Sequence, residues 1–422
     1  MPCATRGATS RRLPSPSSTA SVNRPSSPLH KRHGQTREVT FYDRPEHAEL
    51  RRQVARFVER EVEPNAAAWD EAGFVPREVL RRMGALGWLG LTVPAADGGA
   101  GADRVTNVVF QEALARCTSG GFVVTVLVHT DMADPHLVQA GSDAQKRRWL
   151  PKMLSGELIS AIAVTEADAG SDASALQTRA VVDDAGFALS GSKSIVSNGP
   201  HADFATVFAV VQGPEGTPAG VTAFLVDAET PGYLRARDHT CMGFTGFQGE
   251  LAFDNVRLGE ENVLGQVGAG FPMALAWING NRVRTAAMTV GVARRALARS
   301  AGYAARRQQF GQPIASFQAI QLKLADMATE LYAAELMVER TAAMLDQGLD
   351  IRKEGAMTKL FCSEMVNRAA YEAIQVHGGI GCLAETGIER IYRMVRIFTI
   401  LEGTSEMQRV TIAGRLMREL AR

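Results

Sequence analysis

Residues 163–172 read Ala-Val-Thr-Glu-Ala-Asp-Ala-Gly-Ser-Asp and form the most informative stretch of the chain. The stretch follows a strand-like apolar run and gathers Thr165, Gly170 and Ser171 into an expected loop. Small residues let a backbone approach a flat or phosphorylated ligand, and their N–H and O–H groups supply donors. Two interpretations stay open on physical grounds: a loop that binds an anion or cofactor, or a polar turn between domains.

The hydrophobic period changes on both sides of this loop. Residues 159–268 contain short β-rich runs bounded by glycines, whereas the segments before and after them repeat at the helical period. Long helices with short connections indicate a bundle at the C-terminal end. We therefore predict an α+β protein with an N-terminal helical domain (40–157), a middle antiparallel β domain (158–268) and a C-terminal four-helix bundle (269–422).

The first 39 residues have a different composition. Residues 1–37 contain no Asp or Glu but several Arg and Lys among Ser and Pro, so we expect a disordered basic tail. An Arg- and Ser-rich, acid-free segment is also typical of a transit peptide, which would place the protein in the mitochondrial matrix. Pro14, Pro16, Pro25 and Pro28 interrupt any amphipathic helix, so a cytoplasmic location is favoured.

Bulk composition excludes several classes of function. The 422 residues include 46 basic and 45 acidic ones, so no global field favours nucleic acid as a partner. No apolar run approaches the roughly 20 residues that span a bilayer, so no membrane span is expected. The five cysteines are scattered without paired spacing, and the histidines share no ligand spacing, so no metal is expected.

Four further motifs follow the first loop. They are GSKSIVSNG at 191–199, RQQFG at 307–311 followed by Gln318, HGGIG at 377–381 and LEGTS at 401–405. In this order and spacing, the five elements resemble those of the acyl-CoA dehydrogenase flavoproteins. The resemblance covers essentially residues 40–422 and includes the predicted α–β–α domain order.

The resemblance implies an FAD between the β domain and the C-terminal bundle. Its adenosine and pyrophosphate would be reached by the later motifs of a neighbouring subunit, which implies a homo-oligomer, a tetramer by analogy. An arginine such as Arg307 suits this role because its planar fork pairs with phosphate oxygens, although it could instead cap the helix end before Gly311. The implied FAD-binding residues are Val164, Thr165, Gly170, Ser171, Ile195, Val196, Ser197, Arg307, Gln309, Phe310, Gln318, Gln375, Gly378, Gly379, Thr404 and Ser405.

Glu402 is the candidate catalytic base. Removing hydrogen from the α and β carbons of a thioester needs a base on one face and a hydride acceptor on the other. A carboxylate suits the α-proton where dry surroundings raise its pKa, and Ile397, Phe398, Ile400 and Leu401 precede it. The resemblance also assigns the base to this segment. The alternative is a glutamate that places its charge at the start of the last helix, 405–420.

Some relatives carry the base on an earlier helix, one residue before an arginine. The matching residue here is Asn281, before Arg282, and an asparagine cannot act as a base. Arg282 would line the site, although it could equally be a surface residue of the Arg-rich stretch. Besides Arg282, the residues implied to bind substrate are Ser171 and Gly403.

Three departures from the family pattern limit the substrate assignment. Ile195 replaces the aromatic residue that covers the flavin, and Ala167 replaces a commoner proline. The segment 243–249, GFTGFQG, lacks the usual arginine. Since this loop lies close to the acyl thioester in relatives, an unusual acyl group or carrier is plausible.

The resemblance implies dehydrogenation of an acyl-CoA or acyl-carrier-protein substrate, with electrons passed to electron-transfer flavoprotein or a similar acceptor. Alternatives on the same scaffold are an acyl-CoA oxidase or a flavin monooxygenase that uses oxygen. A catalytically silent flavin-binding protein is the alternative from another class. The presence of Glu402 argues against the monooxygenase, which needs no such base.

Overall fold

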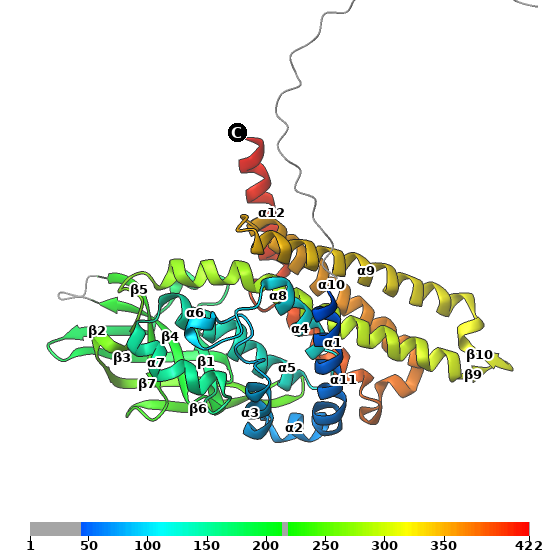
Figure 1. Cartoon of the computed structure of the whole chain (residues 1–422), viewed down its shortest axis with the longest axis horizontal. Helices are drawn as coiled ribbons and strands as arrows, with labels where there is room; N and C mark the ends of the chain where they lie inside the picture. The colour runs from blue at the N-terminus through cyan, green and yellow to red at the C-terminus, as the bar shows by residue number, and fades with distance from the viewer. Residues whose placement is uncertain (1–43, 213–217, 422) are drawn as a thin grey trace, which may run out of the picture. The chain divides into compact units, whose positions relative to one another are not determined.

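A computed structural model describes residues 44–212 and 218–421, which lie within one unit of the chain (residues 41–422). The predicted basic tail, residues 1–39, lies outside the described residues. Among the helices of the described part, none is long and apolar enough to cross a bilayer. Figure 1 shows the order of helices and strands along the chain.

Helices make up the N-terminal part, as predicted. Pro76 precedes α3 and Gly87 follows it at φ 75°, the left-handed conformation that ends a helix easily at glycine. A capping box at Ser142 and Gln145 begins α7. The helices are α1 (Pro45–Phe57), α2 (Ala66–Ala72), α3 (Arg77–Ala85), α4 (Arg104–Leu114), α5 (Gly120–Leu127), α6 (Asp134–Ala140) and α7 (Asp143–Leu154), with π-helical turns η1 (Val58–Val62) and η4 (Val128–Ala133).

The middle part is a largely antiparallel sheet. Its strands are β1 (Ser160–Ala163), β2 (Arg179–Asp183), β3 (Gly186–Ser197), β4 (Phe204–Gln212), β5 (Pro218–Asp227), β6 (Tyr233–Cys241), β7 (Phe244–Leu258) and β8 (Val263–Leu264). The sheet order is β6-β7-β3-β2-β4-β5-β8, and β1 pairs with β4.

The predicted antiparallel β domain is confirmed, and two details add to it. Strands β1 and β2 both run parallel to β4. Strand β6 was not anticipated, because its central residues are charged and exposed and show no apolar alternation. An edge strand needs no second buried face, so charge there is compatible with pairing and hinders association with other chains.

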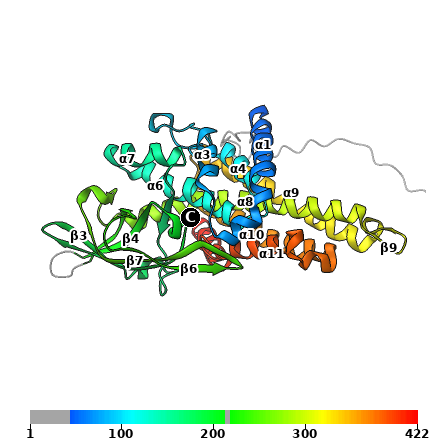
Figure 2. The ribbon, with the colours of Figure 1, turned by 90° about the horizontal axis from the view of Figure 1, so that it is seen from below.

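Helices α6 and α7 lie over one face of the sheet (Figure 2). Trp149 of α7 stacks on Phe204 of β4 with ring centroids 4.3 Å apart. Leu150, Phe208 and Leu264 belong to the same buried cluster, which joins the sheet to the helices. A second cluster fills the other side of the sheet. This packing gives the loop after β1 a rigid base.

The C-terminal part is the predicted helical bundle. It contains α8 (Gly270–Arg306), α9 (Gln318–Asp346), α10 (Arg352–His377), α11 (Ile388–Val395) and α12 (Ser405–Leu420). Short strands β9 (Gln308–Gln309) and β10 (Gln312–Pro313) form the turn between α8 and α9, and 3₁₀ turns η10 (Gly378–Cys382) and η12 (Arg396–Thr399) follow later.

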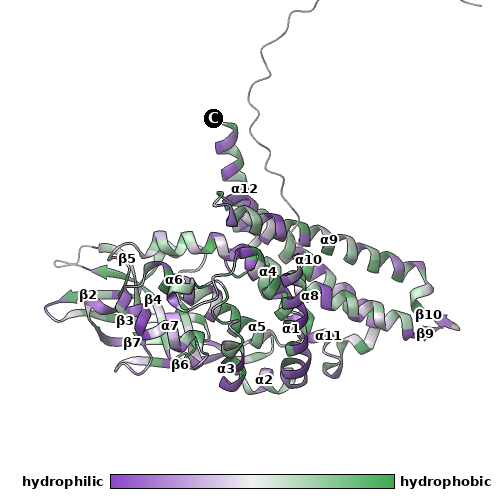
Figure 3. Cartoon of the chain, in the orientation of Figure 1, coloured by the Kyte–Doolittle hydropathy of each residue, from purple (hydrophilic) through white to green (hydrophobic). Residues whose placement is uncertain are grey.

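Helix α8 runs through the centre of the described unit. It contacts α4, α9 and α10, and nearly all residues of its middle section, from Asn281 to Ala293, are buried. By contrast with the buried α8, the last helix, α12, mixes apolar and charged residues, coloured green and purple in Figure 3. Burial of α8 places its polar residues, Asn281 to Thr285, inside the protein. There each polar group needs a partner.

Candidate active site

The loop after β1 is held from beneath by an ion pair. Lys193 of β3 is fully buried, and its Nζ donates to Glu166 Oε1 at 2.7 Å and to the Val164 carbonyl at 3.0 Å. Glu166 also accepts from the backbone N–H groups of Gln177 and Thr178. Burial lowers the pKa of Lys193 to about 8, while the hydrogen bond that it donates to Glu166 favours its charged form. The loop is therefore rigid on its inner side.

The outer side of the same loop faces open space. Gly170 and Ser171 are exposed, and a Cβ added to Gly170 would meet no atom within 4 Å. Thr165 is half-buried, and its carbonyl accepts from the Ser194 N–H at 2.9 Å. Small residues and free donors beside open space fit a flat, phosphorylated cofactor.

Ile195 forms an aliphatic cover beside the loop. It has φ 54°, a conformation rare for a β-branched residue, and 59% of its surface is exposed. The register between β3 and β7 shifts between Lys193 and Val196, which gives the chain the extra residue that turns Ile195 outward. Backbone strain with an exposed apolar side chain is typical of a ligand contact.

This geometry limits how Val196, one of the predicted contacts, can meet a cofactor. The Val196 side chain is 2% exposed and packs in the core of the sheet, so only its backbone remains available to a cofactor. Alternation along β3 is the reason, because successive side chains point to opposite faces. Ser197 is half-buried and lies within 3.5 Å of the Gln248 amide.

A second group of predicted residues gathers at the far end of the bundle. Tyr303 of α8 stacks on His377 of α10 at 4.5 Å, which brings the turn at 307–311 near the HGGIG motif. Phe310 is 91% exposed at φ 52°, and added Cβ atoms on Gly378 or Gly379 would meet nothing within 4 Å. Arg307, Gln309, Gln318 and Gln375 are exposed there as well.

Within one chain, the predicted residues on the β domain lie far from those at the distal end of the bundle. Helix α8 begins against β5, at Gly270, and ends 37 residues later beside the turn (Figure 1). At 1.5 Å per residue this helix is about 55 Å long. The described chain therefore presents two partial surfaces, one on the β domain and one on the distal end of the bundle.

Glu402 lies in the connection between η12 and α12. It has φ 55° and Gly403 has φ 89°, so two successive residues adopt the left-handed conformation. The Gly403 carbonyl accepts from Lys359 Nζ and Gln408 Nε2, each at 2.8 Å, and Gln408 also donates to the Glu402 carbonyl at 3.1 Å. Thr404 caps α12 by accepting from the Met407 N–H. These bonds hold the strained backbone in one conformation.

The Glu402 carboxylate points toward α8. Its Oε1 accepts from Asn281 Nδ2, and its Oε2 accepts from Thr285 Oγ1 at 2.6 Å. Part of the residue remains exposed, yet burial of the carboxyl group raises its pKa above the usual value. The Thr285 bond and the positive charges of Lys359, Arg284 and Arg282 oppose this rise. The group is thus a desolvated carboxylate with two defined donors, which suits a general base.

Lys359 is a buried positive charge that acts on Glu402. It is fully buried on α10, and burial lowers its pKa to about 8, partly offset by the negative charge of Glu402. Arg282 donates to Asn279 Oδ1 at 3.1 Å and makes no ion pair with Glu402, although it acts on that carboxyl through its charge. Arg282 is thus near enough to Glu402 to influence its pKa, and the predicted contact of Arg282 with substrate remains a prediction.

Sequence reasoning did not identify Lys359, Thr285 or Gln408. Each is an ordinary helical residue in the sequence, and only the folded chain brings it to Glu402. Asn281 was considered only as a residue unable to act as a base, yet it is a hydrogen-bond partner of the base. Ser405 has a buried hydroxyl without a partner among the described residues, which leaves it free for a bound ligand.

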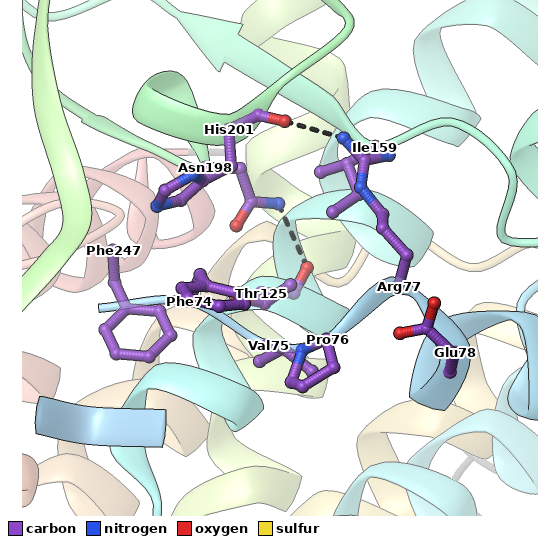
Figure 4. A pocket seen from close by; sticks show the side chains of 10 residues that line it. All are labelled: Phe74, Val75, Pro76, Arg77, Glu78, Thr125, Ile159, Asn198, His201 and Phe247. Atoms are coloured by element: carbon purple, nitrogen blue, oxygen red, sulfur yellow. Dashed lines mark hydrogen bonds between the residues drawn. The ribbon is translucent and has the colours of Figure 1, made fainter. Parts of the chain in front are cut away.

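A cavity of about 300 Å³ lies elsewhere (Figure 4). It lies between the start of α3, helix α5 and the turn after β3, and Phe74 and Phe247 contribute apolar walls. Of its charged groups, Arg77 pairs with Asp203 at 2.6 Å and Glu78 with Arg81 at 3.7 Å, and His201 contacts the Gly73 carbonyl. Because its polar groups are engaged, we do not place the catalytic chemistry there.

The fold, the exposed loop on the β domain and the exposed turns at the distal end of the bundle together define a class of protein, a flavin-dependent oxidoreductase. Family models agree and cover most of the chain: the acyl-CoA dehydrogenase N-terminal domain matches residues 44–157, the middle domain 161–256 and the C-terminal domain 268–417. The chain belongs to the acyl-CoA dehydrogenase family. It is an FAD-dependent enzyme that acts on the CH–CH bond of acyl thioesters.

Individual relatives span almost the whole chain. An acyl-CoA dehydrogenase of Bacillus subtilis is 36% identical over 369 residues, 87% of this chain and 97% of the relative. The caffeyl-CoA reductase-Etf complex subunit CarC of Acetobacterium woodii is 36% identical over 351 residues, 83% of this chain and 92% of the relative. The crystal structure of an acyl-CoA dehydrogenase from Geobacillus kaustophilus has a TM-score of 0.84 and 34% identity, and the match covers 89% of this chain and 99% of that one.

Proposed function

We propose that Glu402 is the base that removes the α-proton of the acyl thioester. The observation that carries this assignment is the pair of hydrogen bonds from Asn281 and Thr285 to a carboxyl group whose burial raises its pKa. A weakly solvated carboxylate with a raised pKa accepts a proton more readily than one in water. Bound FAD supplies the acceptor for the hydride from the β-carbon.

The two donors to Glu402 have different roles when the proton arrives. A hydroxyl group can reverse and accept a hydrogen bond, whereas the amide nitrogen of Asn281 can only donate. The proton therefore settles on Oε2, which faces Thr285, while Asn281 keeps Oε1 in place. Lys359 and Gln408 hold the backbone of residues 402 and 403, so the carboxyl group returns to the same position after each turnover.

We assign FAD to the two partial surfaces. Thr165, Gly170, Ser171 and Ile195 would hold the cofactor on the β domain, and Thr404 would contact it from the start of α12. The adenosine and pyrophosphate would be held at the distal end of the bundle by Arg307, Phe310, Gln318 and Gly378. This end is separated from the β domain by the length of α8, so it cannot serve the same FAD molecule from the same chain. The proposed enzyme is thus a homo-oligomer with cofactor sites shared between subunits, and we propose a tetramer by analogy with the family.

Partners follow from the same assignment. The relative from Acetobacterium woodii is named as part of a complex with Etf, which supports an electron-transfer flavoprotein as acceptor. Other relatives are named reductases, and the same base and cofactor can serve reduction, with Glu402 then returning the proton. The carrier, coenzyme A or an acyl-carrier protein, and the cytoplasmic location remain predictions.

An oxygen-using acyl-CoA oxidase is the second candidate. One structural neighbour, with 30% identity and a TM-score of 0.82, is a prolyl acyl carrier protein oxidase. Rapid reoxidation of the reduced enzyme in air would favour the oxidase, and slow reoxidation would favour the dehydrogenase.

The decisive experiment is anaerobic bleaching of the flavin by a panel of acyl-CoA thioesters. Wild-type protein should bleach with at least one member. Glu402→Gln should bind the same thioester, seen as a shift of the flavin spectrum, without being bleached. Bleaching of the Gln variant at the wild-type rate would remove Glu402 as base. A flavin-loaded wild type that no thioester bleaches would count against the dehydrogenation itself.

A further inference from the structure

The inside of the protein next to Glu402 is polar. Trp277, Asn281 and Arg284 follow one face of α8 at i, i+4 and i+7. The Asp131 carbonyl accepts from Trp277 Nε1 at 2.7 Å and from Arg284 Nη1 at 3.0 Å. Since those donors lie above and below Asn281 on the helix, Asp131 of η4 faces the level of Asn281. Glu402 and Asp131 therefore both border the same asparagine.

Asp131 is the centre of a buried network. Its carboxylate accepts from Asn107 at 2.8 Å, from Gln111, and from Thr130 at 2.8 Å, and it pairs with Arg284 at 3.1 Å. These partners come from α4, η4 and α8. An aliphatic acyl chain would bind poorly against such a surface, because it would remove polar groups from water without giving them hydrogen-bond partners.

Several acceptor atoms in and around this network have no partner among the described residues. They are Asn107 Oδ1, Gln111 Oε1, Asn281 Oδ1 and one carboxyl oxygen of Asp134, whose raised pKa favours the protonated form with an O–H group on the other oxygen. Their amide orientations are set by the network: the NH₂ groups of Asn107 and Gln111 donate to Asp131, and that of Asn281 donates to Glu402. The carbonyl oxygens are therefore left over as acceptors.

His136 adds another acceptor. Its Nδ1 contacts the Met132 carbonyl at 2.6 Å, which requires the proton on Nδ1. Burial lowers the pKa of His136 to about 4, so the ring is neutral and Nε2, which has no partner among the described residues, accepts. The ring lies 5.1 Å from that of Trp277, on the same side of α8 as the network. Unpartnered acceptors thus outnumber the unpartnered donors here, which are the Nε groups of Arg282 and Arg284 and the O–H of Asp134.

We propose that the acyl group of the substrate carries a hydrogen-bond donor, a hydroxyl or amino group, which the acceptors around Asn281 and Asp131 receive. The proposal rests on the proposed function, because the α-carbon must lie at Glu402. The donor cannot be on the β-carbon, from which the hydride leaves, so C4 and C5 are the first positions to examine. Arg284 lies only about 4.5 Å beyond Asn281 along α8, which matches a substituent a few bonds from the α-carbon.

The test compares thioesters in which a methyl group replaces the hydroxyl. The pairs are 4-hydroxybutyryl-CoA with pentanoyl-CoA and 5-hydroxypentanoyl-CoA with hexanoyl-CoA, used for anaerobic flavin reduction. The 4-amino and 5-amino thioesters test the other donor. One donor-bearing thioester should be preferred over its methyl partner by about tenfold to a hundredfold in reduction efficiency, since a site built to bind a donor rejects the analogue without it. Equal or greater efficiency for all methyl thioesters would overturn the proposal.

Asp134→Leu supplies an independent readout. Burial and the nearby Asp131 carboxylate raise the pKa of Asp134 well above its usual range, so an unpartnered carboxyl group is being kept in the interior. Removing it should reduce the preference for the donor-bearing thioester at least severalfold while the melting temperature rises or stays the same. Thr206→Val, which removes a buried and unpartnered hydroxyl from β4, is the matched control and should leave the preference intact.

Failure of the inference and failure of the proposed function give different results. If no thioester bleaches the flavin, the proposed dehydrogenation fails. The same pairs are then compared by the shift that binding causes in the flavin spectrum. Equal binding of both members of each pair, or no binding, would overturn the inference.

Discussion

Thr285→Val isolates one hydrogen bond to the catalytic carboxylate. Valine has nearly the shape of threonine, so the fully buried position keeps its packing and loses only the donor to Glu402 Oε2. A hydrogen bond to a charged group contributes about 1.5–3 kcal/mol. At 1.36 kcal/mol for each pKa unit, its loss should raise the pKa of Glu402 by about one to two units.

The sign of this effect sets the assay. The Thr285 bond opposes the rise that burial causes, so its removal moves the pKa of Glu402 further upward. The acid limb of the pH profile of kcat/KM, which reports ionisation of the free enzyme, should move to higher pH by about one to two units. Below the new pKa the rate should fall about 10- to 100-fold, and it should recover at high pH.

Thr289→Val is the control for this substitution. Thr289 is equally buried one turn later on α8, but its hydroxyl donates to the Ala286 carbonyl and not to Glu402. Its profile should match the wild type. An unshifted acid limb in Thr285→Val, or the same shift in both variants, would refute the role given to Thr285.

Three other substitutions extend the reasoning. Glu402→Gln should raise the free energy of unfolding at neutral pH but not near pH 4, as measured by urea titration at both pH values. A carboxyl group whose pKa is raised by folding binds more protons in the folded state. The wild type therefore loses stability as the pH rises from the unfolded toward the folded pKa of Glu402, and the Gln variant does not. Lys193→Met should reduce stability by about 3–5 kcal/mol in chemical denaturation, because Glu166 would be left buried without its partner. Arg257→Met, at the exposed pair with Asp183, is the control. A smaller loss for Lys193→Met than for Arg257→Met would contradict the prediction. Arg307→Ala should lower FAD retention after gel filtration, and full occupancy in an intact oligomer would count against shared cofactor sites.

Much of the architecture is readable from local pattern. Helices with an apolar stripe and end signals, such as α3 between Pro76 and Gly87, follow from period and capping, and the predicted last helix coincides with α12 (Ser405–Leu420). Glycine-framed motifs located the loop at 163–172 and Glu402. The edge strand β6 could not be predicted from the sequence, because it forms by pairing with β7 and has no apolar pattern of its own.

The sequence by itself determined the kinds of element and their order and pointed to Glu402 as the candidate base, because hydrophobic period, turn residues and motifs are properties of neighbouring residues. Only the tertiary structure decided the surroundings of that base. Asn281 and Thr285 lie 121 and 117 residues from Glu402 along the chain, and Lys359 lies 44 residues from Gly403. No local pattern links such residues. Packing of α8 and α10 brings their polar groups together, and burial there raises the pKa of Glu402.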